Sequence, residues 1–165
     1  MQVKKILVLF FVLLGFASFS FADHGKDMVA CYVKQNHYWS GYGNSCWAMV
    51  DAAGMIFPIV EAKNYRVNCD YHYGNAYVTF TSLREVSKDQ CAEPQEAYWQ
   101  ANQMTVYRDP QVCWQVADAM EWLLSVLTVR NVQYYVYCNP GSMGFIQFQF
   151  EALVPTPAPM PTPTP

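Results

Sequence analysis

The stretch VCWQVADA at residues 112–119 decides the fold that the sequence predicts, because it aligns without a gap with SCWAMVDA at residues 45–52 and matches it at Cys, Trp, Asp and Ala. Two further pairs of stretches align in the same order along the chain: YRVNC (65–69) with YYVYC (134–138), and YVTFT (77–81) with FIQFQ (145–149). Chance can supply one such match. An ordered set of them indicates an internal duplication.

The strongest predicted helix lies in the second copy. Asp109 has the side chain of an N-cap residue, and Pro110 suits the first helical position, where its missing N–H costs nothing. From Val112 to Leu127, apolar residues then recur at helical spacing, with polar residues on the opposite side. This pattern predicts an amphipathic helix that buries one face.

The first copy predicts a shorter helix. It starts at Asn44 or Ser45, is interrupted by Gly54 and stops before Pro58. Residues rich in β-branched and aromatic side chains predict strands after each helix, at 64–69 and 132–138, and turn signals then lead into returning strands. Each copy is therefore expected to form a strand, a helix and two further strands.

Together the copies predict one small, disulfide-stabilised α+β domain built from two tandem strand-helix-strand-strand repeats, since one copy alone would leave a face of its sheet bare. We place repeat one at about residues 28–82 and repeat two at about residues 97–153, within a single folded domain at 23–153. The Pro- and Thr-rich end of the chain, residues 154–165, is expected to be a disordered tail.

The N-terminal residues 1–22 have the layout of a cleavable signal peptide. Lys4 and Lys5 precede an apolar run at 6–16, and the small residues Ser20 and Ala22 follow it. We therefore expect a secreted or periplasmic protein. The run is shorter than a membrane-spanning helix, so we expect no membrane insertion after the signal is cleaved.

Charge excludes one class of partner. Without Lys4 and Lys5 the chain has eight Lys and Arg against thirteen Asp and Glu, a formal net charge of −5. No basic run remains, so we expect no nucleic-acid binding. The histidines form no cluster with the cysteines, and no phosphate-binding glycine loop is present, so we assign neither a metal site nor a cofactor.

Six cysteines lie after the predicted signal: Cys31, Cys46, Cys69, Cys91, Cys113 and Cys138. An even number behind a signal peptide predicts a disulfide framework, although six cysteines allow fifteen pairings. The duplication favours equivalent bridges in the two copies. It therefore predicts Cys46 with Cys69 and Cys113 with Cys138, which leaves Cys31 to pair with Cys91.

The segment GNSCWA at residues 43–48 resembles the nucleophile segment of papain-type cysteine peptidases, where a Cys-Trp pair opens a helix. The resemblance implies a catalytic Cys46 and a histidine base more than a hundred residues downstream. This chain has no histidine after His72, and Cys113 and Trp114 repeat the pair in the second copy. We therefore assign no catalytic residue and interpret each pair as a disulfide cysteine beside a packing tryptophan.

An aromatic, glycine-punctuated loop at residues 36–44 is the candidate binding segment, with His37, Trp39 and Tyr42 as its binding residues. Trp and Tyr can stack on sugars or anchor a protein partner, whereas a buried Trp39 would belong to the core. We expect a non-enzymatic domain that binds an unknown protein or glycan or has a structural role in the envelope. The alternatives are a small secreted hydrolase using Cys46 and an inhibitor of secreted enzymes.

Overall fold

The computed structural model describes residues 28–158, so the predicted signal peptide and the last residues of the predicted tail lie outside the described residues. Its elements follow one another as β1 (Met28–Ser40), α1 (Ser45–Ile59), β2 (Lys63–Asp70), β3 (Asn75–Glu85), the 3₁₀ turn η1 (Lys88–Gln90), β4 (Gln95–Arg108), α2 (Pro110–Val126), β5 (Val129–Tyr137) and β6 (Gly144–Pro155). The described chain is thus α+β. Its last strand ends two residues beyond the predicted domain end at Leu153.

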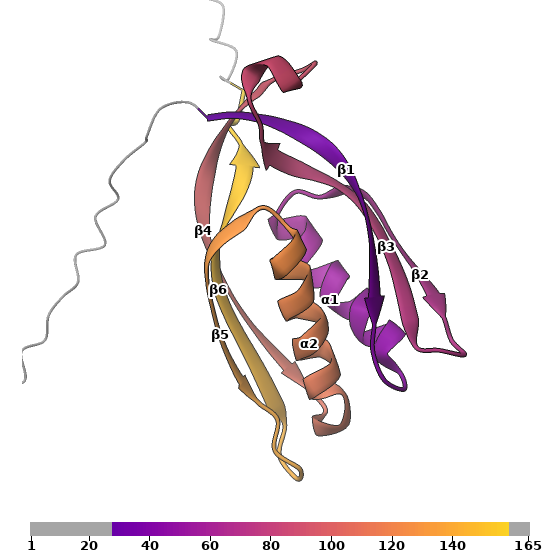
Figure 1. The fold of residues 1–165 in the computed structure, drawn as a ribbon. Coiled ribbons are helices and arrows are strands. Elements are labelled where there is room, and N and C mark those ends of the chain that lie inside the picture. The colour runs from indigo at the N-terminus through magenta and orange to yellow at the C-terminus, as the bar shows by residue number, and fades with distance from the viewer. Residues whose placement is uncertain (1–27, 159–165) are drawn as a thin grey trace, which may run out of the picture.

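The strands form one antiparallel sheet in the order β2-β3-β1-β4-β6-β5. Strands β1 and β3 pair along most of their length, and so do β4 and β6. In contrast, β1 and β4 pair only from Met28–Ala97 to Ala30–Gln95. The sheet is therefore continuous at one end, where β1 and β4 meet, and its two three-stranded arms separate toward the other end (Figure 1).

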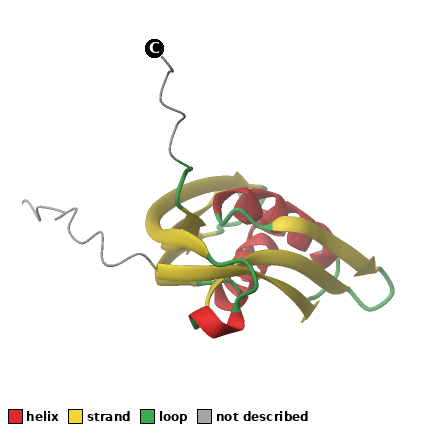
Figure 2. Cartoon of the chain, turned by 90° about the horizontal axis from the view of Figure 1, so that it is seen from above, coloured by secondary structure: helices red, strands yellow, loops and turns green. Residues whose placement is uncertain are grey.

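Both helices lie on the inner side of this curved sheet and pack against each other (Figures 1 and 2). Helix α2 begins as the sequence predicts. The Asp109 carboxylate accepts a hydrogen bond from the Gln111 N–H at 2.9 Å, and Pro110 is the first helical residue. Its apolar face, including Met120 and Leu123, is fully buried.

Helix α1 is longer than predicted. It runs without interruption through Gly54 and includes Pro58, which the sequence analysis placed beyond its end. Pro58 has no N–H and so removes one backbone hydrogen bond, but only two residues of the helix lie from Pro58 to its C-terminal end. The neighbouring Ile56 and Phe57 are fully buried in the core, and this burial stabilises the last turn.

Three disulfides join Cys46 to Cys69, Cys113 to Cys138 and Cys31 to Cys91, the pairs expected from the sequence. The first two connect the first turn of each helix to the strand that follows it, or to the residue just after that strand. The third connects β1 to the segment between β3 and β4. Disulfides of this kind are typical of proteins from oxidising compartments.

A second, smaller apolar cluster lies on the outer face of the sheet, where β1 and β4 meet. Its buried members are Ala30, Leu83, Ala97 and Leu153, and the rings of Tyr32 and Trp99 pack against it. A cation covers each ring: Lys63 Nζ lies 3.9 Å from the Tyr32 centroid and Arg130 Cζ lies 4.4 Å from the Trp99 centroid. The junction between the two arms therefore has apolar packing on its outer face.

Candidate binding surfaces

The disulfide at Cys46 excludes the catalytic thiol that the resemblance to papain-type peptidases implies. No cysteine is free in the described part of the chain, and Cys46 is buried and bonded to Cys69, so it has no thiol to ionise. The adjacent tryptophans are not packing residues, contrary to expectation. Trp47 is 65% exposed and Trp114 is 59% exposed.

The predicted binding loop at 36–44 is strand as far as Ser40. Trp39 is buried, and His37 is half-buried with its ring stacked on Phe80 at a centroid distance of 5.4 Å. Tyr42, in contrast, is almost fully exposed in the loop before α1. The structure therefore does not bring the three candidates together on one exposed loop. It turns two of them inward, toward the helices.

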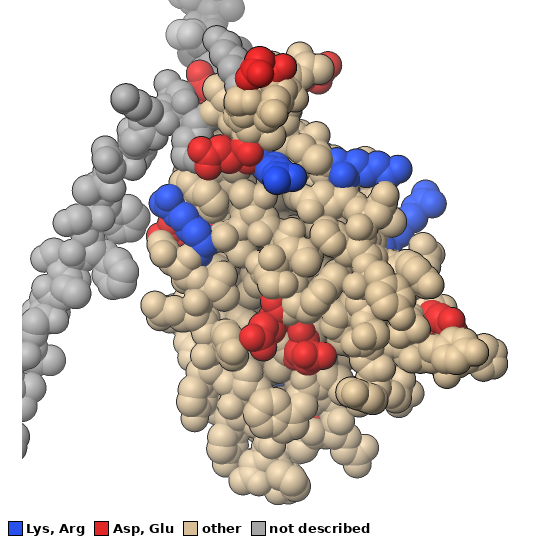
Figure 3. All heavy atoms as spheres, in the orientation of Figure 1, with Lys and Arg blue, Asp and Glu red and all other residues tan. Residues whose placement is uncertain are grey.

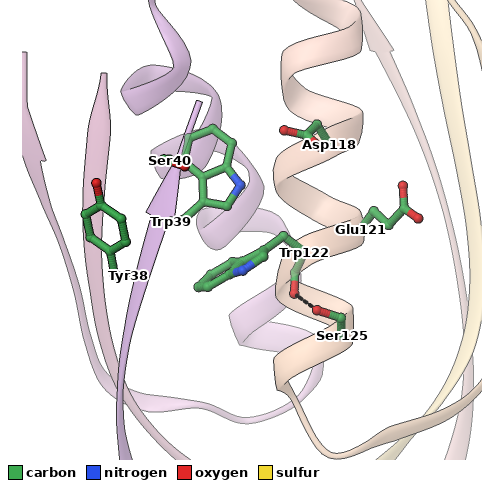
Figure 4. A pocket seen from close by; sticks show the side chains of 7 residues that line it. All are labelled: Tyr38, Trp39, Ser40, Asp118, Glu121, Trp122 and Ser125. Atoms are coloured by element: carbon green, nitrogen blue, oxygen red, sulfur yellow. Dashed lines mark hydrogen bonds between the residues drawn. The ribbon is translucent and has the colours of Figure 1, made fainter. Parts of the chain in front are cut away.

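A cleft of about 460 Å³ opens beside Trp39, between the end of β1 and helix α2. The residues that line it are Tyr38, Trp39, Ser40, Asp118, Glu121, Trp122 and Ser125. In Figure 4 the indoles of Trp39 and Trp122 and the carboxylate of Asp118 lie on the β1 side of α2, whereas the Glu121 carboxylate points away from β1. Glu121 instead accepts a hydrogen bond from the Tyr134 hydroxyl at 2.9 Å.

Asp118 is the ionisable group that faces this cleft. Partial burial, and secondarily the negative charge of Glu121, raise the pKa of the Asp118 carboxyl above its ordinary value. The salt bridges within residues 28–158 are Arg108–Asp51 and Arg130–Glu151, so no cationic side chain of the described chain neutralises Asp118. The cleft is thus an open, negatively charged space bordered by two tryptophans.

The outer face of β4, β6 and β5 presents a second surface. Strand register places residues on it in three rows across the strands: Tyr107–Phe145–Tyr137, Thr105–Gln147–Tyr135 and Gln103–Gln149–Gln133. We call these nine residues the aromatic-amide surface. The rows contain no Lys, Arg, Asp or Glu.

The rings of the aromatic-amide surface are close together and open to solvent. The Phe145 centroid lies 5.5 Å from Tyr135, 5.7 Å from Tyr137 and 6.4 Å from Tyr107. Tyr107 is 61% exposed and Tyr135 is 57% exposed. The next row, Ala101–Glu151–Arg130, bears charges, but Arg130 and Glu151 form an ion pair. The surface is therefore a neutral platform of rings, hydroxyls and carboxamides.

The same face of β2, β3 and β1 differs in charge. Tyr38 and Tyr77 lie opposite each other with centroids 5.2 Å apart. Further along, Arg66 pairs with Thr79 and Lys63 with Thr81, so basic side chains stand where the other arm has only neutral aromatic and amide side chains. The two arms thus present different chemistry on equivalent faces of the sheet.

Two classes of site find no support within residues 28–158. No three side chains of His, Cys, Asp or Glu are gathered as a metal ion would need, and no helix there is long and apolar enough to span a bilayer. Comparison with family models, with curated proteins and with solved structures finds no match for the chain.

Proposed function

We propose that this chain is an exported, non-enzymatic glycan-binding domain and that the aromatic-amide surface is its binding surface. The observation that carries the proposal is the row Tyr107–Phe145–Tyr137 with neutral hydroxyl and amide side chains in the rows beside it. Sugars have apolar C–H faces that stack on aromatic rings, and hydroxyls that both donate and accept hydrogen bonds. Rings supply the first kind of contact. Thr and Gln side chains supply the second.

The absence of unpaired charge from these rows favours a neutral glycan over an acidic one. Gln carboxamides can each donate and accept, so a ladder of Gln103, Gln149 and Gln133 matches the mixed hydrogen-bonding groups of a sugar edge. A rigid sheet also holds these side chains at fixed strand spacing, which limits the entropy lost on binding.

We also propose that the domain arose by tandem duplication and is exported to the periplasm or cell exterior. Both halves have the same order of elements, and Asn64 and Asn131 have nearly the same left-handed φ, 52° and 54°, each at a register shift within an edge strand. Gly74 and Gly141, which precede β3 and β6, both have positive φ. The signal-like residues 1–22 and the three disulfides support export.

The test is binding of the oxidised domain to soluble neutral polysaccharides, such as a β-glucan, a xylan and a galactomannan, by affinity electrophoresis and calorimetry. Tyr107→Ala and Tyr135→Ala should each weaken binding about tenfold, or ~1.4 kcal/mol. Tyr77→Ala removes an equally exposed ring from the other arm and is the matched control. If no glycan binds, or if Tyr77→Ala weakens binding as much, the proposal is wrong.

A further inference from the structure

We propose that the cleft between β1 and α2 binds an arginine side chain of a protein partner, with Asp118 as the counter-ion and Trp39 and Trp122 as aromatic walls. This site is separate from the aromatic-amide surface, because it lies on the helix side of the sheet. It would let the domain hold a protein and a glycan at the same time.

The chain itself places a guanidinium beside Asp51, the residue of α1 that corresponds to Asp118 of α2. Asp51 in α1 and Asp118 in α2 each lie five residues after the disulfide cysteine of their helix. Arg108, the last residue of β4, donates from Nε to Asp51 Oδ2 at 2.6 Å and from Nη2 to Asp51 Oδ1 at 2.9 Å. The end of β4 and α1 are thus joined by a bidentate arginine–carboxylate pair.

The end of β1 lacks such an arginine. It finishes at Ser40 and is followed by Gly41, where a Cβ atom would come within 2.5 Å of both the Trp39 ring and the Ser45 side chain. Strand register places Trp39, opposite Ala76, where the second half has Arg108, opposite Gly144, so a neutral indole stands where the other half has a guanidinium. Asp118 consequently faces open space, whereas Asp51 faces a guanidinium.

The tryptophans that border the cleft also favour a cationic ligand. Indole rings attract cations through the negative face of the π-system, more strongly where water is excluded. Trp39 is buried and forms the base of the cleft, whereas Trp122 is half-buried and presents the ring that a guanidinium can contact. Arginine combines a planar guanidinium that stacks on rings with a fork of donors that matches a carboxylate, which favours it over lysine.

The charge around the cleft is a further argument. In Figure 3 the acidic atoms over α2 stand in a broad uncharged area, and the basic atoms gather toward the end where β1 and β4 meet. On the face shown, the basic atoms therefore lie away from the acidic atoms over α2.

The probe is the blocked peptide acetyl-Gly-Arg-Gly-amide, titrated into ¹⁵N-labelled oxidised domain, and the readout is the indole N–H signals of Trp39 and Trp122. We expect saturable shifts of both signals, and at least fivefold weaker effects from the uncharged citrulline peptide. Asp118→Asn should weaken binding about tenfold. Asp89→Asn, an exposed site in η1, is the control and should leave the titration unchanged.

A second variant separates lost binding from lost folding. Ser125→Arg places a guanidinium on the cleft wall, one helical turn after Glu121, and should block the peptide while the amide spectrum stays that of the folded domain. The proposal is overturned if the two indole signals do not respond, if citrulline is as effective as arginine, or if Asp118→Asn binds normally. Shifts caused by a neutral oligosaccharide alone would also overturn it, and would assign the cleft to a glycan.

Discussion

Arg108→Ala should leave the Asp51 carboxylate without its guanidinium partner, at a small cost in stability. The side chains of Arg108 and Asp51 are 27% and 39% exposed, so water screens much of their attraction. Exposed ion pairs contribute about 0.2–1 kcal/mol, and the bidentate geometry places this one near the upper end. The Arg108 guanidinium also contacts Met55 Sδ at 3.2 Å. We therefore expect a loss of about 1 kcal/mol, or roughly 3–5 °C in Tm for a domain of this size.

The assay is a double-mutant cycle on Arg108→Ala, Asp51→Asn and the double variant, measured by urea unfolding at low and high salt. The coupling energy should be about 0.5–1 kcal/mol and should fall with added salt. A coupling energy below about 0.2 kcal/mol, or one that does not fall with added salt, would refute the reasoning.

Three further predictions concern stability. Replacing Cys31 and Cys91 by Ser removes a bridge that closes a sequence separation of 60, which should cost about 4 kcal/mol in urea unfolding, against about 3.5 kcal/mol for either shorter bridge by loop entropy. Asp118→Asn should stabilise the domain by about 0.2–0.5 kcal/mol at pH 7, since like charges one helical turn apart repel. Because the pKa of Asp118 is raised in the folded state, this gain should vanish as the pH falls below the ordinary value of 3.8, in melts across that range. Asp109→Ala should cost about 1 kcal/mol through loss of the N-cap, measured by thermal unfolding, with Asp89→Ala as a control that changes nothing.

Sequence reasoning succeeded where the signal was local. The cap at Asp109 and Pro110 and the apolar spacing that follows define α2 without any distant contact. The end of β1 has no such local signal. Residues up to Ser40 are held extended by pairing with β3, whose first residue, Asn75, lies opposite Ser40. Trp39 is buried because it belongs to the core cluster that residues of both helices complete. The glycines and aromatic residues at 36–44 indicate neither the pairing with β3 nor the packing that buries Trp39.

The two candidate binding surfaces differ in the same way. The alternation Gln103, Thr105, Tyr107 along β4 could have indicated a solvent-facing row of ring and amide side chains, although no strand was predicted there. The cleft has no such signal. Trp39 and Asp118 are 79 residues apart in the chain and line one cleft only because the fold brings the end of β1 and α2 to its two sides. Local spacing cannot report a contact made by helix packing.

The walls of the cleft come from different halves of the chain, β1 from the first and α2 from the second. The Arg108–Asp51 contact joins the halves in the opposite sense, β4 of the second to α1 of the first. One half of the chain alone contains only one of the two elements that form the β1–α2 cleft, and only one of the two that form the Arg108–Asp51 contact. A ligand held in this cleft would therefore contact both halves of the chain at once, and neither half alone could provide the proposed site.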